Sequence, residues 1–282
     1  MLENIKICLV CVCYNAHEDA SKFLLSIEKS FFRVSKLATV ELTVVLSDNS
    51  NLEFPESKKS NFSYNFKYRR NENIGYFPAF NAGLNEVFFN RDLFDYIIVS
   101  NVDLEIDVNF FERLIKVEFE QAVGVIAPRI MVKGQDFDQN PKILERPKKS
   151  KFIFMLLICS NTFLFSFYKT LHVVKRWLNS SGRSSNGYAK NVILDIYAPH
   201  GAFIIFTKSY IQSKASTEYP RMLFGEEIFV AEQARISGLK VRYNPSLVVF
   251  DREHGSTSFK SAGFLCKHNW LSYRYLLENF FR

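Results

Sequence analysis

Apolar runs alternate with amphipathic stretches along the first 130 residues of the chain. Residues 5–12 (IKICLVCV) and 96–100 (YIIVS) are nearly continuous apolar runs, as expected for strands buried on both faces. Residues 17–34 instead repeat apolar side chains at helical spacing. Glu18 and Asp19 fall in the first turn of this predicted helix, where the helix dipole favours acids. The alternation predicts a mostly parallel sheet with helices on both faces.

The same patterns assign the remaining elements. Further strands are predicted at residues 40–47, 64–69 and 123–128, and further helices at 78–89 and 108–119. Strand patterns return at 192–197, 201–206, 240–243 and 246–250, with an acid-led helix at 226–238 and a C-terminal helix within 259–282. The predicted fold class is therefore α/β, as one domain over residues 1–282.

Residues 146–190 have a different character. Four basic residues, Arg146, Lys148, Lys149 and Lys151, precede an uncharged stretch at 152–168, and more basic residues follow. This stretch is barely long enough to span a bilayer, which takes about 17–25 apolar residues. The chain on its two sides must also meet in one fold, which excludes a single crossing. The pattern predicts an inserted apolar and basic helical segment, either packed on protein or lying on an anionic membrane surface.

Composition narrows the class of protein. With 282 residues, 48% of them hydrophobic, the chain can bury the core of one large domain. Five cysteines form an odd set without disulfide or zinc spacing. The N-terminal apolar run lacks the basic lead and cleavage site of a secretion signal, so a cytoplasmic location is expected. The net charge of +7 suits a polyanionic or membrane-surface partner. No motif for nucleic-acid binding is present, so a nucleic-acid partner is not expected.

Polar clusters follow four of the predicted strands. They read CYNAHE after the first strand, SDNSN after the second, NENIGYFPAFNAG after the third and SNVDLEID after the fourth. Each cluster alone is an ordinary turn composition. Because ligands of open parallel sheets bind beyond the carboxyl ends of the strands, four such clusters in succession predict one binding crevice.

The order of these clusters resembles that of the family 2 glycosyltransferases, which have the GT-A nucleotide-sugar-binding fold, and especially the rhamnosyltransferase-like branch of bacterial polysaccharide enzymes. The matching residues are Tyr14, Asn15, Asp48, Asn49, Ser50, Asn73, Gly75, Ala79, Asn81, Gly83, Asn101 and Asp103, and later Arg235, Gly238 and Pro245. The resemblance extends over residues 5–258. It implies a nucleotide-sugar-binding half at 1–130, the insertion at 146–190, an acceptor and catalytic half at 191–258, and a C-terminal helix at 259–282.

The resemblance implies an inverting enzyme that moves a hexosyl or deoxyhexosyl group from a UDP- or dTDP-sugar. The acceptor would be a glycan, lipid-linked through a polyprenyl diphosphate, in the synthesis of O-antigen or capsule. Such an enzyme would lie in the cytoplasm or peripherally on the inner face of the cytoplasmic membrane, and a homo-oligomer is left open.

The donor site follows residue by residue. Asp48 would accept the N3–H of a uracil or thymine ring, and the same side chain could close an Asx turn. Tyr14 and Asn15 would line the nucleotide pocket, although packing explains Tyr14 equally well. Asn73 and Gly75 would lie close to the diphosphate and Asn81 would face it from a helix, with a glycine-permitted turn and a helix-facing amide as the alternatives.

The metal and the general base also follow from the resemblance. Asp103 would bind a divalent cation, Mn²⁺ or Mg²⁺, and Asn101 would hydrogen-bond a ribose or phosphate in place of a first aspartate. Asp251 falls at a position where relatives carry histidine, and His254 follows, so either could be a ligand. Glu227 would be the general base, although it and Glu226 could merely favour a helix N-terminus.

Two neighbouring acids receive a structural interpretation only. Glu105 and Asp107 are expected to begin the helix that follows, with Asp107 as its cap.

Two other functions remain open. A catalytically inactive glycan-binding or scaffolding relative would fit Asn101 and Phe229, each of which stands where relatives carry aspartate. A sugar nucleotidyltransferase would also use an α/β sheet and a metal. It normally has a glycine-rich loop with a basic residue near the N-terminus, and CYNAHEDAS contains no glycine.

Overall fold

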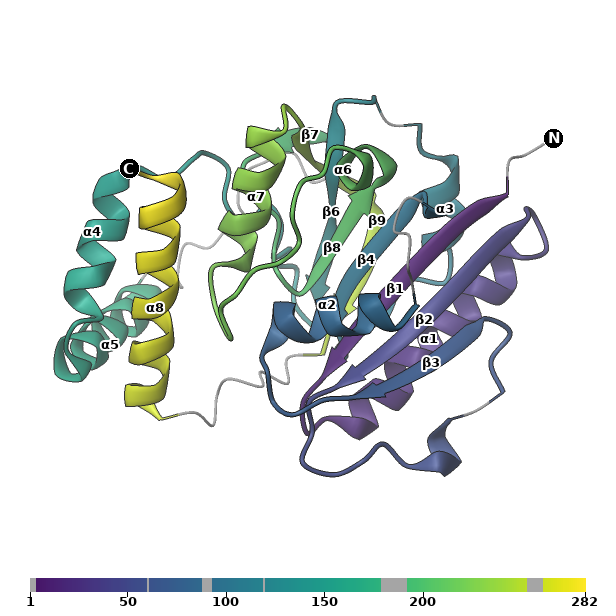
Figure 1. Cartoon of the computed structure of the whole chain (residues 1–282), viewed down its shortest axis with the longest axis horizontal. Helices are drawn as coiled ribbons and strands as arrows, with labels where there is room; N and C mark the ends of the chain where they lie inside the picture. The colour runs from purple at the N-terminus through teal and green to yellow at the C-terminus, as the bar shows by residue number, and fades with distance from the viewer. Residues whose placement is uncertain (1–3, 60, 88–92, 119, 179–191, 253–260) are drawn as a thin grey trace.

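The computed structural model describes residues 4–59, 61–87, 93–118, 120–178, 192–252 and 261–282. Over this part of the chain it contains a nine-stranded sheet with helices on both faces, which confirms the predicted α/β class (Figure 1).

The N-terminal half is parallel, as the alternating pattern predicted. The strands are β1 (Ile5–Cys13), β2 (Val40–Asp48), β3 (Asn65–Arg70) and β4 (Tyr96–Asn101). Their connections carry α1 (His17–Val34), the short 3-10 helix η1 (Glu56–Lys58) and α2 (Tyr76–Val87). β2 and β4 both pair with β1, and β3 pairs with β2, all in parallel register. The carboxyl ends of these strands therefore meet at one edge of the sheet.

The second half of the sheet is mixed. It consists of β5 (Leu104–Ile106), β6 (Val123–Val132), β7 (Leu194–Ile196), β8 (Phe203–Thr207) and β9 (Lys240–Asp251). The order across the sheet is β3-β2-β1-β4-β8-β6-β9-β5, with β7 also on β9. β8 runs antiparallel to β4 and β6, so its amino end reaches the same edge as the carboxyl end of β4. This reversed strand brings the residues before β8 to the predicted crevice.

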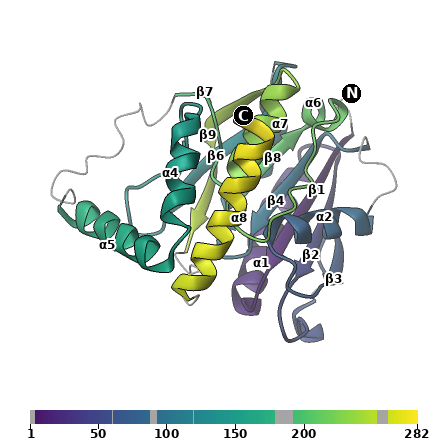
Figure 2. The same cartoon turned by 60° about the vertical axis from the view of Figure 1, so that its left-hand side comes forward.

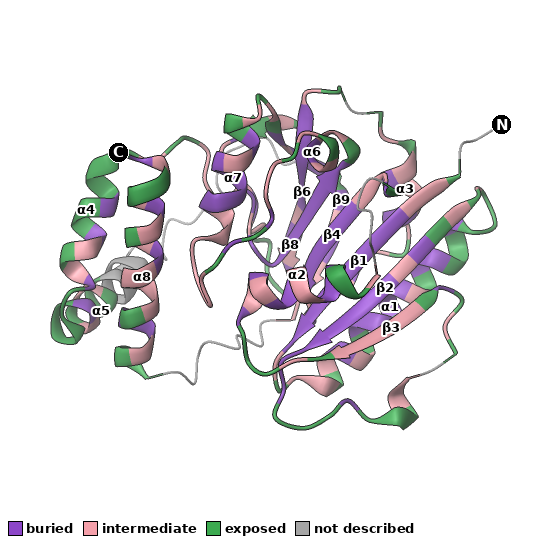
Figure 3. Cartoon of the chain, viewed as in Figure 1, coloured by how far each residue is buried: buried purple, intermediate pink, exposed green. Residues whose placement is uncertain are grey.

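One hydrophobic layer covers each face of the sheet. Alternate side chains of β1 belong to one layer or the other. Ile7, Leu9 and Cys11 face the layer under α1 and α3 (Phe110–Lys116). Cys8 and Val10 face the opposite layer. That layer is covered by α2, α6 (Lys208–Gln212), α7 (Glu226–Ile236) and α8 (Ala262–Phe280). Figure 3 shows the buried strands between these helices.

The acids after β4 do not begin a helix, so that expectation was wrong. Glu105 lies in β5, where its carboxylate accepts hydrogen bonds from Lys133 and Arg252. α3 starts later, with Asn109 at its N-cap. Asp107 Oδ1 accepts the backbone N–H of Asn109 at 2.9 Å, so this side chain closes a turn before the helix. Pairing with β9 provides ladder partners for residues 104–106 and overrides their local preference for a helix start.

The C-terminal apolar run is also more continuous than expected. Residues 240–250 were predicted as two strands, but β9 passes through Pro245 without a break. The register of β9 against β6 shifts next to Pro245. On β6 the shift falls between Pro128 and Arg129. Such an irregularity lets a strand tolerate a residue that cannot donate to the ladder.

The segment at 146–190 forms two helices, α4 (Lys149–Ile158) and α5 (Thr162–Leu178), and residues 179–191 lie outside the described part. Figures 1 and 2 show both helices beside α8, at the end of the molecule farthest from the N-terminus. Phe152 is fully buried, with its ring centroid 4.1 Å from that of Phe281. Within the described chain, no single helix is long and apolar enough to cross a membrane, whereas this pair meets that test together but is bent by 115°.

A buried carboxylate ties the inserted helices to the domain. Glu232 of α7 has no exposed surface, and it accepts hydrogen bonds from Arg146, Arg235 and the Tyr197 hydroxyl. Arg146 also donates to the carbonyl of Phe280 at 2.7 Å, at the end of α8. Burial alone would raise the pKa of Glu232, but these donors outweigh it and lower the pKa below the usual range. Glu232 thus joins α7, the segment leading into α4 and the end of α8.

We expect Glu232→Ala to lower the free energy of unfolding by about 2–4 kcal/mol at pH 7, because it removes the acceptor shared by two arginines. Because the folded-state pKa is depressed, this contribution is present above the unfolded-state value and is lost as pH falls through the folded-state value. The difference from wild type in urea unfolding should therefore shrink on acidification. Glu145→Ala, an exposed acid nearby, is the control. Equal destabilisation of both variants would contradict the prediction.

Candidate active site

A cavity of about 220 Å³ opens at the edge where the carboxyl ends of the parallel strands meet. Its volume is several times that of a water molecule, about 30 Å³. The chain before β5 contributes Val12, Tyr14, Ala16, Asn49, Asn73, Gly75, Tyr76, Asn101, Val102 and Asp103. The later chain contributes His200, Gly201, Ala202, Met222, Leu223, Phe224, Glu226, Glu227 and Phe264. The two halves that were expected to bind donor and acceptor therefore line the same cavity.

Strand register aligns the predicted polar residues. Val12 of β1 lies opposite Asn101 of β4, and Cys13 lies opposite Asp48 of β2. The Asn101 backbone N–H donates to the carbonyl of Ala202 at 2.9 Å, which joins the end of β4 to the start of β8. Six of the residues expected in the site therefore reach the cavity. They are Tyr14, Asn73, Gly75, Asn101, Asp103 and Glu227.

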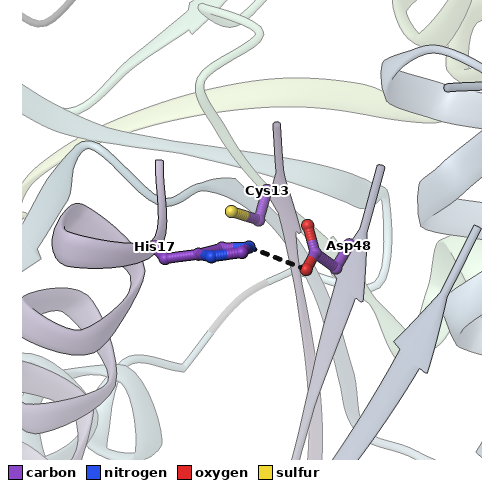
Figure 4. A group of neighbouring side chains, drawn as sticks. All are labelled: Cys13, His17 and Asp48. Carbon is purple, nitrogen blue, oxygen red and sulfur yellow. Dashed lines mark hydrogen bonds and ion pairs between the residues drawn. The ribbon is translucent and has the colours of Figure 1, made fainter. Parts of the chain in front are cut away.

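Asp48 is not among the residues that line the cavity. It is fully buried, and its Oδ2 accepts a hydrogen bond from the Tyr68 hydroxyl at 3.1 Å and lies 3.0 Å from His17 Nε2 (Figure 4). Oδ1 accepts the backbone N–H of Ser50, so the expected Asx turn is present. Cys13 lies beside this pair, and burial together with the charge of Asp48 raises the pKa of its thiol to about 12. Contacts with β3, with the start of α1 and with the loop after β2 therefore hold the Asp48 carboxylate in place.

Two other expected residues make structural contacts outside the cavity. Asn15 has a left-handed backbone conformation, with a φ of 52°. Its side-chain oxygen accepts a hydrogen bond from the backbone N–H of Asn51, which joins the loops after β1 and β2. Asn81 does not face the cavity. Its amide donates to the carbonyls of Phe77 and Thr217, and its oxygen accepts the Thr217 hydroxyl. These bonds fasten α2 to the segment before α7 and turn the Asn81 side chain away from the cavity.

The expected metal ligands separate into three cases. Asp103 lines the cavity, and its carbonyl accepts the backbone N–H of Arg252 at 3.1 Å. Asp251, at the end of β9, is not among the lining residues, and its carboxylate accepts a hydrogen bond from Gln139 at 2.6 Å. His254 lies outside the described residues. Asp103 is thus the one of these three that the structure places at the cavity.

Glu226 and Glu227 enter the cavity from the first turn of α7, whose N-cap is Gly225 at φ 85°. Both carboxylates lie against the backbone of Gly201. A Cβ atom on Gly201 would lie 2.9 Å from Glu226 Oε1 and 3.3 Å from Glu227 Oε1. Burial, and then the neighbouring charge of Glu227, raise the pKa of Glu226 well above its usual range. Glu226 therefore carries a proton at neutral pH.

Tyr76 lines the cavity together with acids from both halves of the chain. Its hydroxyl donates to the carbonyl of Gly201 at 2.8 Å. Burial raises its pKa well above the usual range, and the charges of Glu226, Asp103 and Glu227 raise it further. Three carboxyl groups thus surround one phenol. Among the described residues that line the cavity there is no lysine or arginine.

Several residues that line the cavity had no role assigned from the sequence, namely Tyr76, Asn49 and Phe264. His200 also lines the cavity. Burial, with the nearby charge of Lys142, lowers the pKa of His200 to about 3, so its imidazole is neutral. Its Nδ1 accepts the backbone N–H of Ala202 at 3.2 Å. One signal in the sequence could have identified Tyr76. It directly follows Gly75, and it is the first residue of α2, next to the crevice.

Gly75 explains how the two halves meet. It has a φ of 96°, and the N–H of the next residue, Tyr76, donates to the carbonyl of Met222 at 3.1 Å. A Cβ on Gly75 would lie 2.3 Å from that carbonyl oxygen and 2.5 Å from Met222 Cα. Only glycine permits both this dihedral and this approach.

Comparison with known proteins adds a family and a fold. The profile of the family described as Glycosyl transferase family 2 matches residues 8–175, more than half of the chain. No curated protein sequence matches. The crystal structure of GalNAc-T7 with UDP, GalNAc and Mn²⁺ is similar over 97% of this chain, with a TM-score of 0.60 and 14% identity. The chain spans about half of that protein, 48% of its length, and the likeness is one of fold.

We expect Gly75→Ala to destabilise the protein by about 2–4 kcal/mol, since it adds a backbone clash to an unfavourable dihedral. Gly134→Ala is the matched control, because Gly134 has a φ of 80° but no atom within 4 Å of an added Cβ. That variant should lose only about 1 kcal/mol. Urea denaturation measures both. Equal losses would show that the contact with Met222 adds nothing.

Proposed function

The chain belongs to glycosyl transferase family 2, and on that premise we propose that it transfers a sugar from a nucleoside diphosphate donor to an acceptor hydroxyl, with inversion at the anomeric carbon. One observation carries this proposal. A single cavity presents Asp103 from the β4 edge and Glu226 and Glu227 from α7. A carboxylate on each side is what activation of a diphosphate leaving group and of an attacking hydroxyl requires.

The lining of the cavity fits a divalent cation. A donor diphosphate is anionic, yet the described lining contains carboxyl groups and no lysine or arginine. A bound Mn²⁺ or Mg²⁺ prefers oxygen ligands and would supply the charge that neutralises the leaving diphosphate. Asp103 would hold it, and Asn101, the last residue of β4, would hydrogen-bond the ribose or a phosphate. The Mn²⁺ in the GalNAc-T7 structure is consistent with this assignment.

Glu227 is suited to act as the base. Its carboxylate would accept the proton of the acceptor hydroxyl while that oxygen bonds to the anomeric carbon. The bond from this carbon to the diphosphate oxygen then breaks, and the nucleoside diphosphate leaves with the electron pair. Attack from the face opposite the leaving group inverts the configuration. Glu226, protonated at neutral pH because its pKa is raised, can donate a hydrogen bond to the acceptor.

The finer assignments rest on the sequence resemblance. A uracil or thymine ring donating to Asp48 would have to replace the Tyr68 hydroxyl or the His17 imidazole, because both contact Oδ2. The acceptor we propose is a glycan, linked through a polyprenyl diphosphate, in O-antigen or capsule synthesis. The apolar wall formed by Leu223, Phe224 and Phe264 supports an acceptor with an apolar part.

The inactive alternative gains no support from Phe229. This side chain is 2% exposed and packs on Tyr219, Tyr275 and Phe280, outside the cavity. An aspartate at this position would be a buried charge in an aromatic core. The departure at Phe229 therefore removes no group from the cavity.

We expect Asp103→Ala to abolish metal-dependent donor hydrolysis and transfer while the urea midpoint stays unchanged, because a cavity ligand is lost and no core contact. A panel of UDP- and dTDP-sugars with and without Mn²⁺ or Mg²⁺ supplies the assay. Asp251→Asn is the companion variant, since its amide oxygen can still accept from Gln139. Near-normal turnover of Asp103→Ala at saturating Mn²⁺ would remove Asp103 from the site, and equal loss in Asp251→Asn would assign it as a ligand too.

We expect Glu227→Gln to lower kcat about 10²–10⁴-fold with donor binding preserved, since an amide cannot accept the proton. Glu226→Gln mimics the protonated acid and should retain activity within about tenfold at pH 7. The raised pKa of Glu226 predicts that its ionisation appears on the alkaline side of the kcat–pH profile and disappears in Glu226→Gln. If Glu226→Gln were the more damaging change, the two roles would be exchanged.

A further inference from the structure

Helices α4 and α5 expose large apolar side chains on the side that does not contact α8. We call this surface the outer apolar face, and its members are 44% to 77% exposed. They are Ile153, Phe154 and Leu157 of α4, and Phe163, Phe167 and Leu171 of α5. Monomeric soluble proteins seldom expose a contiguous apolar patch of this kind without a partner.

The outer apolar face has helical spacing on both helices. In α4 its members are separated by one and three positions, and in α5 each follows the last by four. The opposite side of α4 is already packed, because Phe152, Met155 and Cys159 are buried against α8 and the C-terminus. From Phe152 to Ile158, α4 is thus apolar around its circumference, which is typical of a helix with apolar surroundings on every side.

The charged residues in the stretch of sequence that contains this face are all basic. Residues 146–194 contain nine lysines and arginines and no aspartate or glutamate. These nine charges exceed the net charge of +7, so the remainder of the chain is slightly acidic. Lys148, Lys149 and Lys151 are exposed at the start of α4, and Lys169 is exposed on α5.

We propose that the outer apolar face and its lysines dock the protein on an anionic lipid bilayer, with α4 and α5 lying in the interface. An apolar face edged by bases fits lipid headgroups and the acyl chains beneath them. A second copy fits poorly, because pairing two such faces would bring their exposed lysines together. The 115° bend between α4 and α5 also favours a pair that lies on the surface over a straight span.

Docking in this way has a consequence for the cavity. Phe264 of α8 lines the cavity and packs in the same cluster as Met155 and Phe165. A bilayer bound at α4 and α5 would therefore lie one helix away from the acceptor side of the cavity. This consequence rests on the proposed function, whereas the docking itself does not.

The test is flotation of the full chain with vesicles of phosphatidylglycerol and phosphatidylcholine, in the absence of donor. Wild type should float with these vesicles and not with phosphatidylcholine alone. Leu157→Ser/Phe163→Ser/Phe167→Ser should reduce the partition coefficient about tenfold or more, with an unchanged urea midpoint. The control is Phe32→Ser/Leu52→Ser/Ile236→Ser, which removes three exposed apolar side chains elsewhere and should float as wild type does.

A separate variant tests the contribution of the lysines to docking. Lys148→Gln/Lys149→Gln/Lys151→Gln should also weaken flotation, and its residual binding should depend less on salt, because fewer charges contact the headgroups. Donor hydrolysis in solution is measured for each variant, so a failure of docking is separable from a failure of the transferase assignment.

Three results would overturn the proposal. The first is that wild type does not float with anionic vesicles at low salt. The second is equal loss of flotation in the two serine triple variants. The third is a dimer in sedimentation velocity without lipid that dissociates in Leu157→Ser/Phe163→Ser/Phe167→Ser, since the outer apolar face would then be an interface between copies.

Discussion

The backbone of Gly75 touches the backbone of Met222, and the cavity depends on this contact. Gly75 ends the loop that follows β3, and Met222 precedes α7, so the contact fixes the parallel half of the sheet against the helix that carries Glu226 and Glu227. The Tyr76 N–H bonds the Met222 carbonyl, and the Tyr76 hydroxyl then reaches Gly201 before β8. One glycine with a φ of 96° therefore aligns three chain segments.

The electrostatics of the cavity follow from that alignment. Asp103 lies far in sequence from Glu226 and Glu227. Burial raises the pKa of Tyr76, and the charges of these three acids raise it further. Burial, and then the neighbouring charge of Glu227, keep the proton on Glu226 at neutral pH. A cavity of this kind favours a cation and holds a protonated carboxyl group beside a second carboxyl group on the same helix turn. Both properties suit the transfer of a sugar from a diphosphate, and both arise from packing rather than from any single residue.

Much of the fold was predictable, and the exceptions share a cause. The parallel strands β1 to β4 and the helices between them follow from periodicity, which reports the faces that become buried. The direction of β8 relative to its neighbours was not predictable, because a short apolar run of five residues is compatible with parallel and with antiparallel pairing. Asp107 and Glu105 were misassigned for a related reason, since pairing with β9 decided a segment whose local preferences favoured a helix start. Side-chain direction was likewise beyond prediction at Asn81, which Thr217 turns away from the cavity.

Local periodicity and composition were sufficient to predict the α/β alternation, the polar clusters at the ends of the parallel strands and the apolar, basic character of residues 146–190. Every short stretch of chain carries this information within itself. The folded chain alone revealed that β8 is antiparallel, that Asp48 is buried beside His17 and Tyr68, and that one side of α4 packs while the other is exposed. Each of these depends on contacts between segments that are distant along the chain, and no pattern within one segment encodes its partner.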